Sequence, residues 1–107
     1  MTEPAKQPAM PVRGQTLDRS AAEEIARTLR AVADPTRIQM LGLILASPTG
    51  ETTVGELADA LGLRQPTITH HVHILVEDGV VVKEPIGRQV RLSIAPARRA
   101  SVEDLLR

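Results

Sequence analysis

Two short segments with a helical spacing of apolar residues meet at Gly62, and this junction constrains the fold more than any other feature of the sequence. Thr53 and Glu56 have the spacing of a capping box, which predicts a helix that begins after Thr53. Gly62 is suited to end that helix, and Pro66 to occupy the first turn of a second one. The apolar stripes are Val54, Leu57, Ala58 and Leu61 in the first helix and Ile68, Val72 and Leu75 in the second. Two helices joined by so tight a turn form a helix-turn-helix.

The amino-terminal part of the chain divides into a predicted tail and a predicted helix. Residues 1–16 contain three prolines among polar and small residues and show no apolar periodicity, so we expect a disordered tail. Good helix formers then recur roughly from Asp18 to Ala33. The apolar residues of that helix share one face, and they are Ile25, Leu29 and Val32. Because 107 residues can fill one modest core, we expect a single domain from residue 17 to residue 107.

A further helix start follows at Asp34 and Pro35. The carboxylate of Asp34 can accept hydrogen bonds from the first amides of a helix, and proline suits the first helical position. This helix is expected to run to about Ser47. Its centre, residues 40–46, is apolar on nearly every face, so we expect it to be buried on several sides as the core helix.

A β-hairpin is predicted after the helix-turn-helix. Residues 80–84 begin with three valines, residues 89–94 form a second strand-like run, and Gly87 lies in the turn between them. Pro96 suits the first turn of a last helix. The apolar residues of these elements are Val90, Leu92 and Ile94 in the second strand and Val102, Leu105 and Leu106 in the helix. The expected fold class is therefore mainly α with a small β-hairpin (α+β): a winged helix-turn-helix of about five helices plus a two-stranded wing.

The residue types that the chain lacks exclude several kinds of site. It has no cysteine, which excludes disulfides, thiolate metal sites and cysteine nucleophiles. It also has no Phe, Tyr or Trp, so single-stranded bases have no aromatic side chain to stack on, and duplex DNA is the favoured nucleic acid. The longest strongly apolar run is too short to span a bilayer and no signal-peptide pattern is present, so we expect a cytoplasmic protein without a membrane partner.

The charges are unevenly distributed although the formal net charge is zero. Residues 64–99 contain three acidic residues and six basic ones, a local excess of three positive charges. The basic residues are Arg64, Lys83, Arg88, Arg91, Arg98 and Arg99. If these residues share a surface, the molecule has one basic face, which suits a nucleic acid.

Several of these segments, taken together, resemble the ArsR/SmtB family of winged-helix repressors. The segments are Ala33-Asp34-Pro35-Thr36-Arg37-Ile38, Glu56-Leu57-Ala58, Leu61-Gly62-Leu63, Gln65-Pro66-Thr67-Ile68-Thr69-His70-His71 and Gly87-Arg88-Gln89-Val90. The resemblance covers about residues 20–95 in order and spacing. It implies a homodimer formed through the first and last helices, which binds an imperfectly palindromic operator in double-stranded DNA. It also implies release by an inducer, although for this sequence a small molecule, an unrecognised inducer and a repressor without any ligand all remain open. No cofactor is expected, and no enzymatic activity.

The resemblance also implies which residues contact DNA. The helix that begins near Gln65 meets the major groove, and the hairpin forms a wing beside it. Gln can pair with adenine, Thr can reach a base edge or methyl group, and Arg suits a phosphate. The candidate DNA-binding residues are Arg64, Gln65, Pro66, Thr67, Thr69, His70, His73, Arg88 and Arg91. Arg64 stands where relatives commonly have a capping serine, so the helix loses a cap while the surface gains a positive charge.

The sequence leaves the inducer and some alternatives open. Thr53 and Gly55 stand where relatives that sense heavy metals often carry a Cys-x-Cys pair, and the last helix contains no histidine. The three histidines at 70, 71 and 73 instead allow a metal-responsive repressor with histidine and carboxylate ligands as an alternative, although no metal site is assigned. A winged helix that binds protein instead of DNA is another alternative. Arg88 and Arg91 could also only solubilise a hairpin edge, and Arg37 could be a local ion-pair partner.

Overall fold

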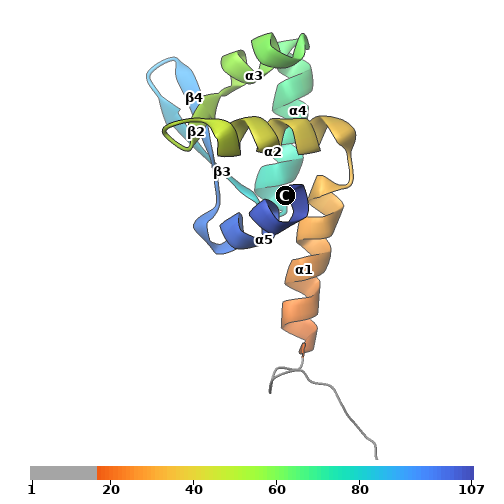
Figure 1. Ribbon diagram of the computed structural model, residues 1–107. Helices are drawn as coiled ribbons and strands as arrows, with labels where there is room; N and C mark the ends of the chain where they lie inside the picture. The colour runs from red at the N-terminus through yellow and green to blue at the C-terminus, as the bar shows by residue number, and fades with distance from the viewer. Residues whose placement is uncertain (1–16) are drawn as a thin grey trace, which may run out of the picture.

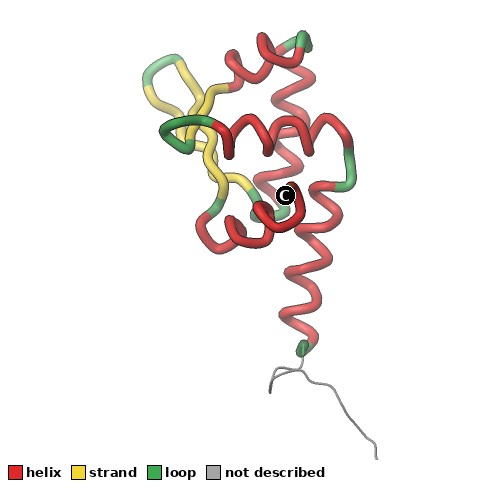
Figure 2. The backbone as a smooth tube through the Cα atoms, in the orientation of Figure 1, coloured by secondary structure: helices red, strands yellow, loops and turns green. Residues whose placement is uncertain are grey.

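The computed structural model describes residues 17–107, and in this range it contains five α-helices, a short 3-10 helix and a three-stranded antiparallel sheet (Figures 1 and 2). The elements in chain order are α1 (Arg19–Val32), α2 (Pro35–Ala46), β2 (Glu51–Thr53), α3 (Val54–Leu61), α4 (Gln65–Glu77), β3 (Val81–Ile86), β4 (Gln89–Ile94), η2 (Pro96–Arg98) and α5 (Arg99–Leu106). This order confirms the mainly α winged helix-turn-helix. The tail predicted for residues 1–16 lies outside the described residues.

Helices α1, α2 and α3 each begin after a residue whose side chain caps the helix. The side chain of Asp18 accepts a hydrogen bond from the amide of Ala21 at 2.8 Å, and Asp34 accepts one from Thr36 at 2.8 Å. At the start of α3, the Thr53 hydroxyl accepts from the amide of Glu56, and the Glu56 carboxylate accepts from the amide of Thr53. This pair of bonds is the predicted capping box.

The turn between α3 and α4 also has its predicted geometry. Gly62 has a φ of 67°, in the left-handed region that glycine adopts most easily, and the amide of Leu63 donates to the carbonyl oxygen of Ala58 at 3.0 Å. Arg64 precedes α4, and its side chain makes no capping hydrogen bond. The helix-turn-helix therefore closes through a well-formed turn, while α4 starts without the side-chain cap that a serine would supply.

The sheet has one strand more than the predicted two-stranded wing. The hairpin of β3 and β4 is confirmed, with Val81 opposite Ile94 and Ile86 opposite Gln89. The additional strand, β2, pairs antiparallel with the other edge of β4, and Thr52 lies opposite Leu92. Only three residues make up β2. A strand of this length is too short to show an alternating pattern in the sequence. It forms because the free edge of β4, about forty residues later in the chain, pairs with it.

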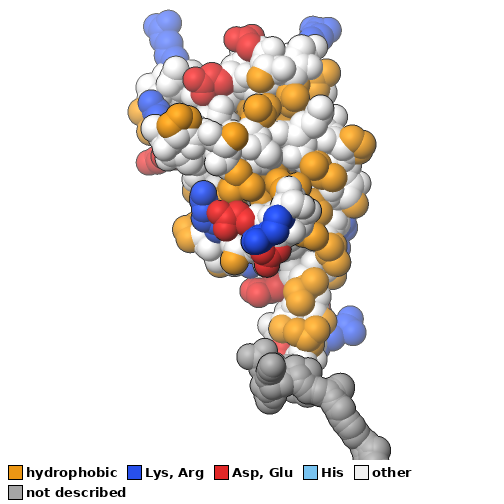
Figure 3. Space-filling model, in the orientation of Figure 1, with side chains coloured by type: hydrophobic (Ala, Val, Ile, Leu, Met, Phe, Trp, Pro, Cys, Tyr) orange, Lys and Arg blue, Asp and Glu red, His pale blue; other side chains and the backbone are white. Residues whose placement is uncertain are grey.

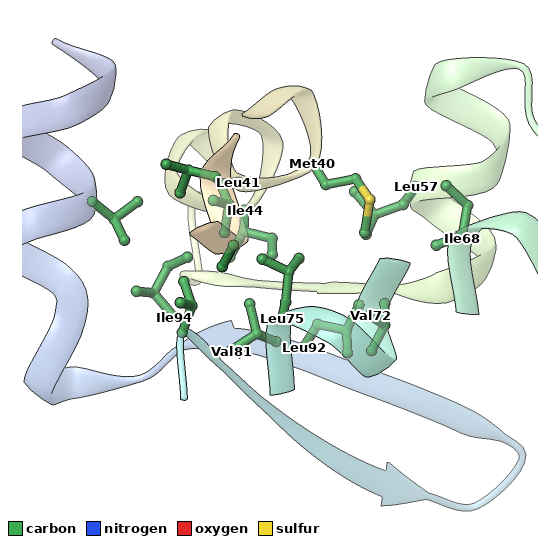
Figure 4. Packing of buried hydrophobic residues seen from close by; sticks show 14 of the residues in the cluster. Met40, Leu41, Ile44, Leu57, Ile68, Val72, Leu75, Val81, Leu92 and Ile94 are labelled. Carbon is green, nitrogen blue, oxygen red and sulfur yellow. The ribbon is translucent and has the colours of Figure 1, made fainter. Parts of the chain in front are cut away.

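The hydrophobic core forms where α2 meets the helix-turn-helix and the sheet (Figure 4). Met40, Leu41 and Ile44 are fully buried, as expected for a core helix. The same buried cluster includes, from other elements, Leu57, Ile68, Val72, Leu75, Val81, Leu92 and Ile94. The buried stripe predicted for α4 is confirmed in full. None of the helices within residues 17–107 is long and apolar enough to cross a membrane.

The apolar face of α1 is only partly buried. Val32 belongs to the core, but Ile25 and Leu29 are 45% and 49% exposed. Figure 1 shows why: the first half of α1 extends away from the body of the molecule, and only its end reaches α2. In the space-filling view, hydrophobic side chains line this projecting helix (Figure 3).

Candidate nucleic-acid interface

Helix α4 presents a polar surface because its apolar residues are all used by the core. Ile68, Val72 and Leu75 point inward and are at most 2% exposed. The sequence-predicted site residues of this helix lie on its exposed faces, and they are Gln65, Pro66, Thr67, Thr69, His70 and His73. Arg64 is also exposed, directly before the first turn. A helix with this division can enter a groove of duplex DNA without disturbing the core.

The wing brings a second group of polar side chains to the amino-terminal end of α4. Arg88 is exposed in the turn of the hairpin, next to Gly87, whose φ of 61° permits the tight reversal. A cavity of about 310 Å³ separates the wing from the helix-turn-helix. It is lined by Gln65 and Thr69 of α4, by Arg88 and Gln89 of the wing, and by Thr53 and Gly55 at the start of α3. Predicted residues from α4 and from the wing thus face the same groove.

Arg91, the other predicted wing residue, lies apart from this groove. Its Nη1 atom is 3.1 Å from Oε1 of Glu51, an ion pair that connects β4 to β2. Arg91 and Glu51 line a different cavity, of about 320 Å³, at the base of the wing. The Nε atom of Arg91 is buried and has no hydrogen-bond partner among the described residues. The structure therefore places Arg91 in the connection between wing and body, with part of its charge already neutralised.

The three histidines have three different surroundings. His70 is exposed, and Nε2 of His73 lies 3.6 Å from Oε2 of Glu77 on the next turn. His71 is partly buried, and its Nδ1 atom lies 3.2 Å from Nη1 of Arg37. Within residues 17–107, no group of three or more His, Asp or Glu side chains gathers closely enough to hold a metal ion.

The electrostatic environment of His71 and Asp34 differs from that of surface residues. Burial lowers the pKa of His71 below its ordinary value of 6.5, and the charges of Arg37 and His70 act in the same direction, whereas Asp34 opposes them. The hydrogen bond from the amide of Arg37 lowers the pKa of the Asp34 carboxyl. Near neutral pH, His71 is therefore uncharged and Asp34 is ionised.

Sequence reasoning missed two groups of residues at this site. Gln89, Thr53 and Gly55 line the groove between α4 and the wing, but of the residues that line it only Gln65, Thr69 and Arg88 were predicted as site residues. Gln89 follows the hairpin turn and belongs to a strand with alternating burial, so its outward position could have been inferred from that alternation. The contact between Arg37 and His71 joins residues 34 positions apart and has no signal in the local sequence.

Comparisons with known proteins find helix-turn-helix transcriptional regulators. A family described as a helix-turn-helix domain matches residues 32–84. The chain is 38% identical over 82 residues to a probable mercury resistance operon repressor of Streptomyces lividans, covering 77% of this chain and 63% of the relative. It is 33% identical over 88 residues to the HTH-type transcriptional regulator NmtR of Mycobacterium tuberculosis, covering 82% of this chain and 71% of the relative. The chain thus spans less than two thirds of the Streptomyces relative.

Solved structures with the same fold include HlyU from Vibrio cholerae, at a TM-score of 0.73 and 27% identity over 82% of this chain and 94% of that one. Another is the homodimeric winged helix-turn-helix DNA-binding domain Mb0332 from Mycobacterium bovis, described as a possible ArsR-family transcriptional regulator. It matches with a TM-score of 0.68 and 30% identity over 89% of this chain and 86% of that one.

Proposed function

Because the chain belongs to the ArsR/SmtB family of winged helix-turn-helix transcriptional regulators, a family of regulators and not of enzymes, we propose that it is a homodimeric repressor of transcription. It binds double-stranded DNA at an imperfectly palindromic operator and blocks transcription there. The observation that carries this proposal is the groove in which Gln65 and Thr69 of α4 face Arg88 and Gln89 of the wing.

The exposed residues of α4 and of the wing are proposed to make two kinds of DNA contact, to bases and to the backbone. Gln65, Thr67 and Thr69 lie at the amino-terminal end of α4, the part of a recognition helix that contacts base edges, and they are proposed to read sequence. The residues proposed to contact the DNA backbone or groove edges are Arg64, Pro66, His70, His73 and Arg88. Arg91 contributes charge near the DNA, while its bond to Glu51 holds the wing to β2.

The dimer is proposed to form through α1 and α5. Ile25 and Leu29 of α1 and Leu105 of α5 are each about half exposed, and they line one cavity of about 300 Å³ between the two helices. A second copy of this chain would cover these side chains around a two-fold axis. The two α4 helices would then lie about one helical turn of DNA apart, roughly 34 Å, which suits a palindromic site.

The proposed release signal is a small molecule that favours a dimer geometry in which the two α4 helices no longer match the groove spacing. The name of the Streptomyces relative refers to mercury resistance, but this chain has no cysteine and therefore no thiolate site for such a metal. The same absence excludes sensing through thiol oxidation.

Hydroxyl-radical footprinting on duplex DNA from upstream of the coding sequence tests this proposal. A dimer that reads a palindrome protects two patches of backbone related by two-fold symmetry, with centres about 10 base pairs apart. A single asymmetric patch would contradict the dimeric arrangement. No protection at any protein concentration, on upstream duplexes that tile the region, would contradict DNA binding and favour a protein partner.

A further inference from the structure

A chain of polar contacts runs from the end of α1 to the middle of α4 through one side chain, that of Arg37. Its Nε atom donates to the carbonyl oxygen of Ala31 at 2.7 Å, in the last turn of α1. In addition, the backbone amide of Arg37 donates to Oδ1 of Asp34 at 3.1 Å, in the turn before α2. Its Nη1 atom lies 3.2 Å from Nδ1 of His71 on α4. From its place on α2, Arg37 thus bonds to α1, to the turn before α2 and to α4.

The bond between Arg37 and His71 has a defined direction. A guanidinium can only donate, so Nδ1 of His71 must accept and the proton of the neutral imidazole must reside on Nε2. A proton on Nδ1 would remove the acceptor and place two positive charges side by side. The charged or titratable groups that face His71 are Asp34 from the turn before α2, Arg37 from α2 and His70 from its own helix.

We propose that Arg37 and His71 are positioning residues for DNA binding: their hydrogen bond fixes the orientation of α4 relative to α1, and uptake of a proton by Nδ1 of His71 releases α4. This inference rests on the proposed function, because α1 is proposed to build the dimer and α4 to read the DNA. His71 itself touches no DNA, since it is partly buried against α2 while its neighbour His70 faces outward.

Several features suit the pair to this role. His71 lies between Ile68 and Leu75 on the inner side of α4, so the bond adds a directional constraint to a surface that otherwise holds the helix by non-directional apolar contacts. The bond is partly buried, where competition from water is weaker than at the surface. Each dimer contains two such pairs. A small tilt of α4 at both sites therefore changes the fit to both half-sites together.

Three variants distinguish residues that position α4 from residues that contact DNA directly. His71→Asn keeps an acceptor, because its Oδ1 takes the place of Nδ1, but it cannot be protonated. His71→Leu and Arg37→Met each replace one partner of this hydrogen bond with an apolar side chain of similar volume. Gln39→Ala serves as the control, since it changes an exposed residue of α2 that lies outside both the pair and the proposed DNA interface. The measurement is fluorescence anisotropy of each protein with an upstream duplex at about pH 8 and about pH 5.5, across a salt series.

At about pH 8, we expect His71→Asn to bind as the wild type does, and we expect His71→Leu and Arg37→Met to bind roughly tenfold more weakly. Their salt dependence should equal that of the wild type, because no phosphate contact is lost. At about pH 5.5, the wild type should lose affinity relative to His71→Asn, whereas Gln39→Ala should lose it as the wild type does. Wild-type affinity in His71→Leu, or the same pH profile in His71→Asn and the wild type, would overturn the inference.

An NMR titration of the free protein tests, in the absence of DNA, whether the hydrogen bond between Arg37 and His71 holds α4 in place. We expect the backbone amides of α4 in the wild type to shift as His71 takes up its proton, and those of His71→Asn to shift much less over the same range. Equal shifts in the two proteins would refute the link even if DNA binding is normal. If the wild type binds no duplex, the proposed function fails, while this titration still tests whether His71 holds α4.

Discussion

Two arginines of the wing, Arg88 and Arg91, were predicted as equivalent DNA contacts, but their surroundings differ. Among residues 17–107, Arg88 has no carboxylate partner, whereas Arg91 is paired with Glu51 at 3.1 Å. Both are basic residues in the predicted hairpin, so the local sequence predicts a DNA contact for each of them. The difference comes from β2, which brings Glu51 beside β4.

The first prediction compares these two side chains. We expect Arg88→Ala to weaken binding to specific and scrambled duplexes alike and to lower the salt slope by about one, because one phosphate contact is lost. Arg91→Ala should lower the slope less, since Glu51 already neutralises part of its charge. Arg19→Ala, which removes an exposed arginine of α1, is the control. Anisotropy titrations across a salt series measure all three, and equal slopes for Arg88→Ala and the control would refute the assignment of Arg88.

The second prediction concerns His71 and the stability of the fold. Because burial lowers its pKa in the folded state, the unfolded chain takes up this proton first as the pH falls through 6.5. The free energy of unfolding should therefore be greatest above pH 6.5, decrease below it, and level off once the pH is below the folded-state pKa.

Urea denaturation of the wild type and His71→Asn between about pH 8 and about pH 5 measures this effect. The range stays above the region in which Asp34 titrates. We expect the wild type to lose stability relative to the variant as the pH decreases. Parallel curves would show that His71 has the same pKa in the folded and unfolded chains.

At the scale of elements, local signals predicted the five α-helices, although Pro96, which was expected in the first turn of the last one, lies in the 3-10 helix η2 and α5 begins at Arg99. Asp34 and Thr53 bond to amides two or three positions away, and Gly62 supplies its own left-handed turn. The strand β2 could not be predicted in this way, because its hydrogen bonds depend on β4. The groove that Gln89 lines could not be predicted for the same reason: alternation along the strand indicates that Gln89 faces outward, but the groove forms only when the wing folds against α3 and α4.

The third prediction tests the missing cap of α4. Arg64→Ser supplies a hydroxyl that can accept from an amide of the first turn, so the free energy of unfolding should rise by about 1 kcal/mol. The same change removes a positive charge, so DNA binding should weaken and its salt slope should fall by about one.

Arg64→Ala is the matched control, because it removes the charge without adding a cap. It should weaken DNA binding as Arg64→Ser does, without the gain in stability. Urea denaturation and anisotropy measure the two properties separately. Unchanged DNA binding in both variants would remove Arg64 from the interface and leave it a role only at the helix start.

At the scale of the whole molecule, the exposed apolar face of α1 and α5 is the feature that one chain alone does not explain. The spacing of Ile25 and Leu29 predicted an apolar face on α1, and the family resemblance implied a dimer through the first and last helices. The structure shows that both side chains remain about half exposed in one chain. The periodicity alone could not distinguish a face that covers its own core from one that covers a partner.

The fourth prediction follows from this face. Leu29→Glu should convert the dimer to a monomer, because it places a charge at the centre of the proposed interface. Specific DNA binding should then fall by roughly a hundredfold or more, since one half-site is lost. Val82→Glu is the control for the oligomeric state, because Val82 is 45% exposed in β3 and belongs to neither α1 nor α5. Sedimentation velocity measures the oligomeric state, and a dimeric Leu29→Glu variant would place the interface elsewhere.

The most direct test of the central claim is the affinity of the wild-type protein for two duplexes across a salt series. One duplex comes from upstream of its coding sequence, and the other is a scrambled version of it. The account predicts tighter binding to the upstream duplex and a steep loss of affinity for both as the salt concentration rises. Absence of binding to either duplex at low salt would contradict the account and point to a protein partner for the winged helix.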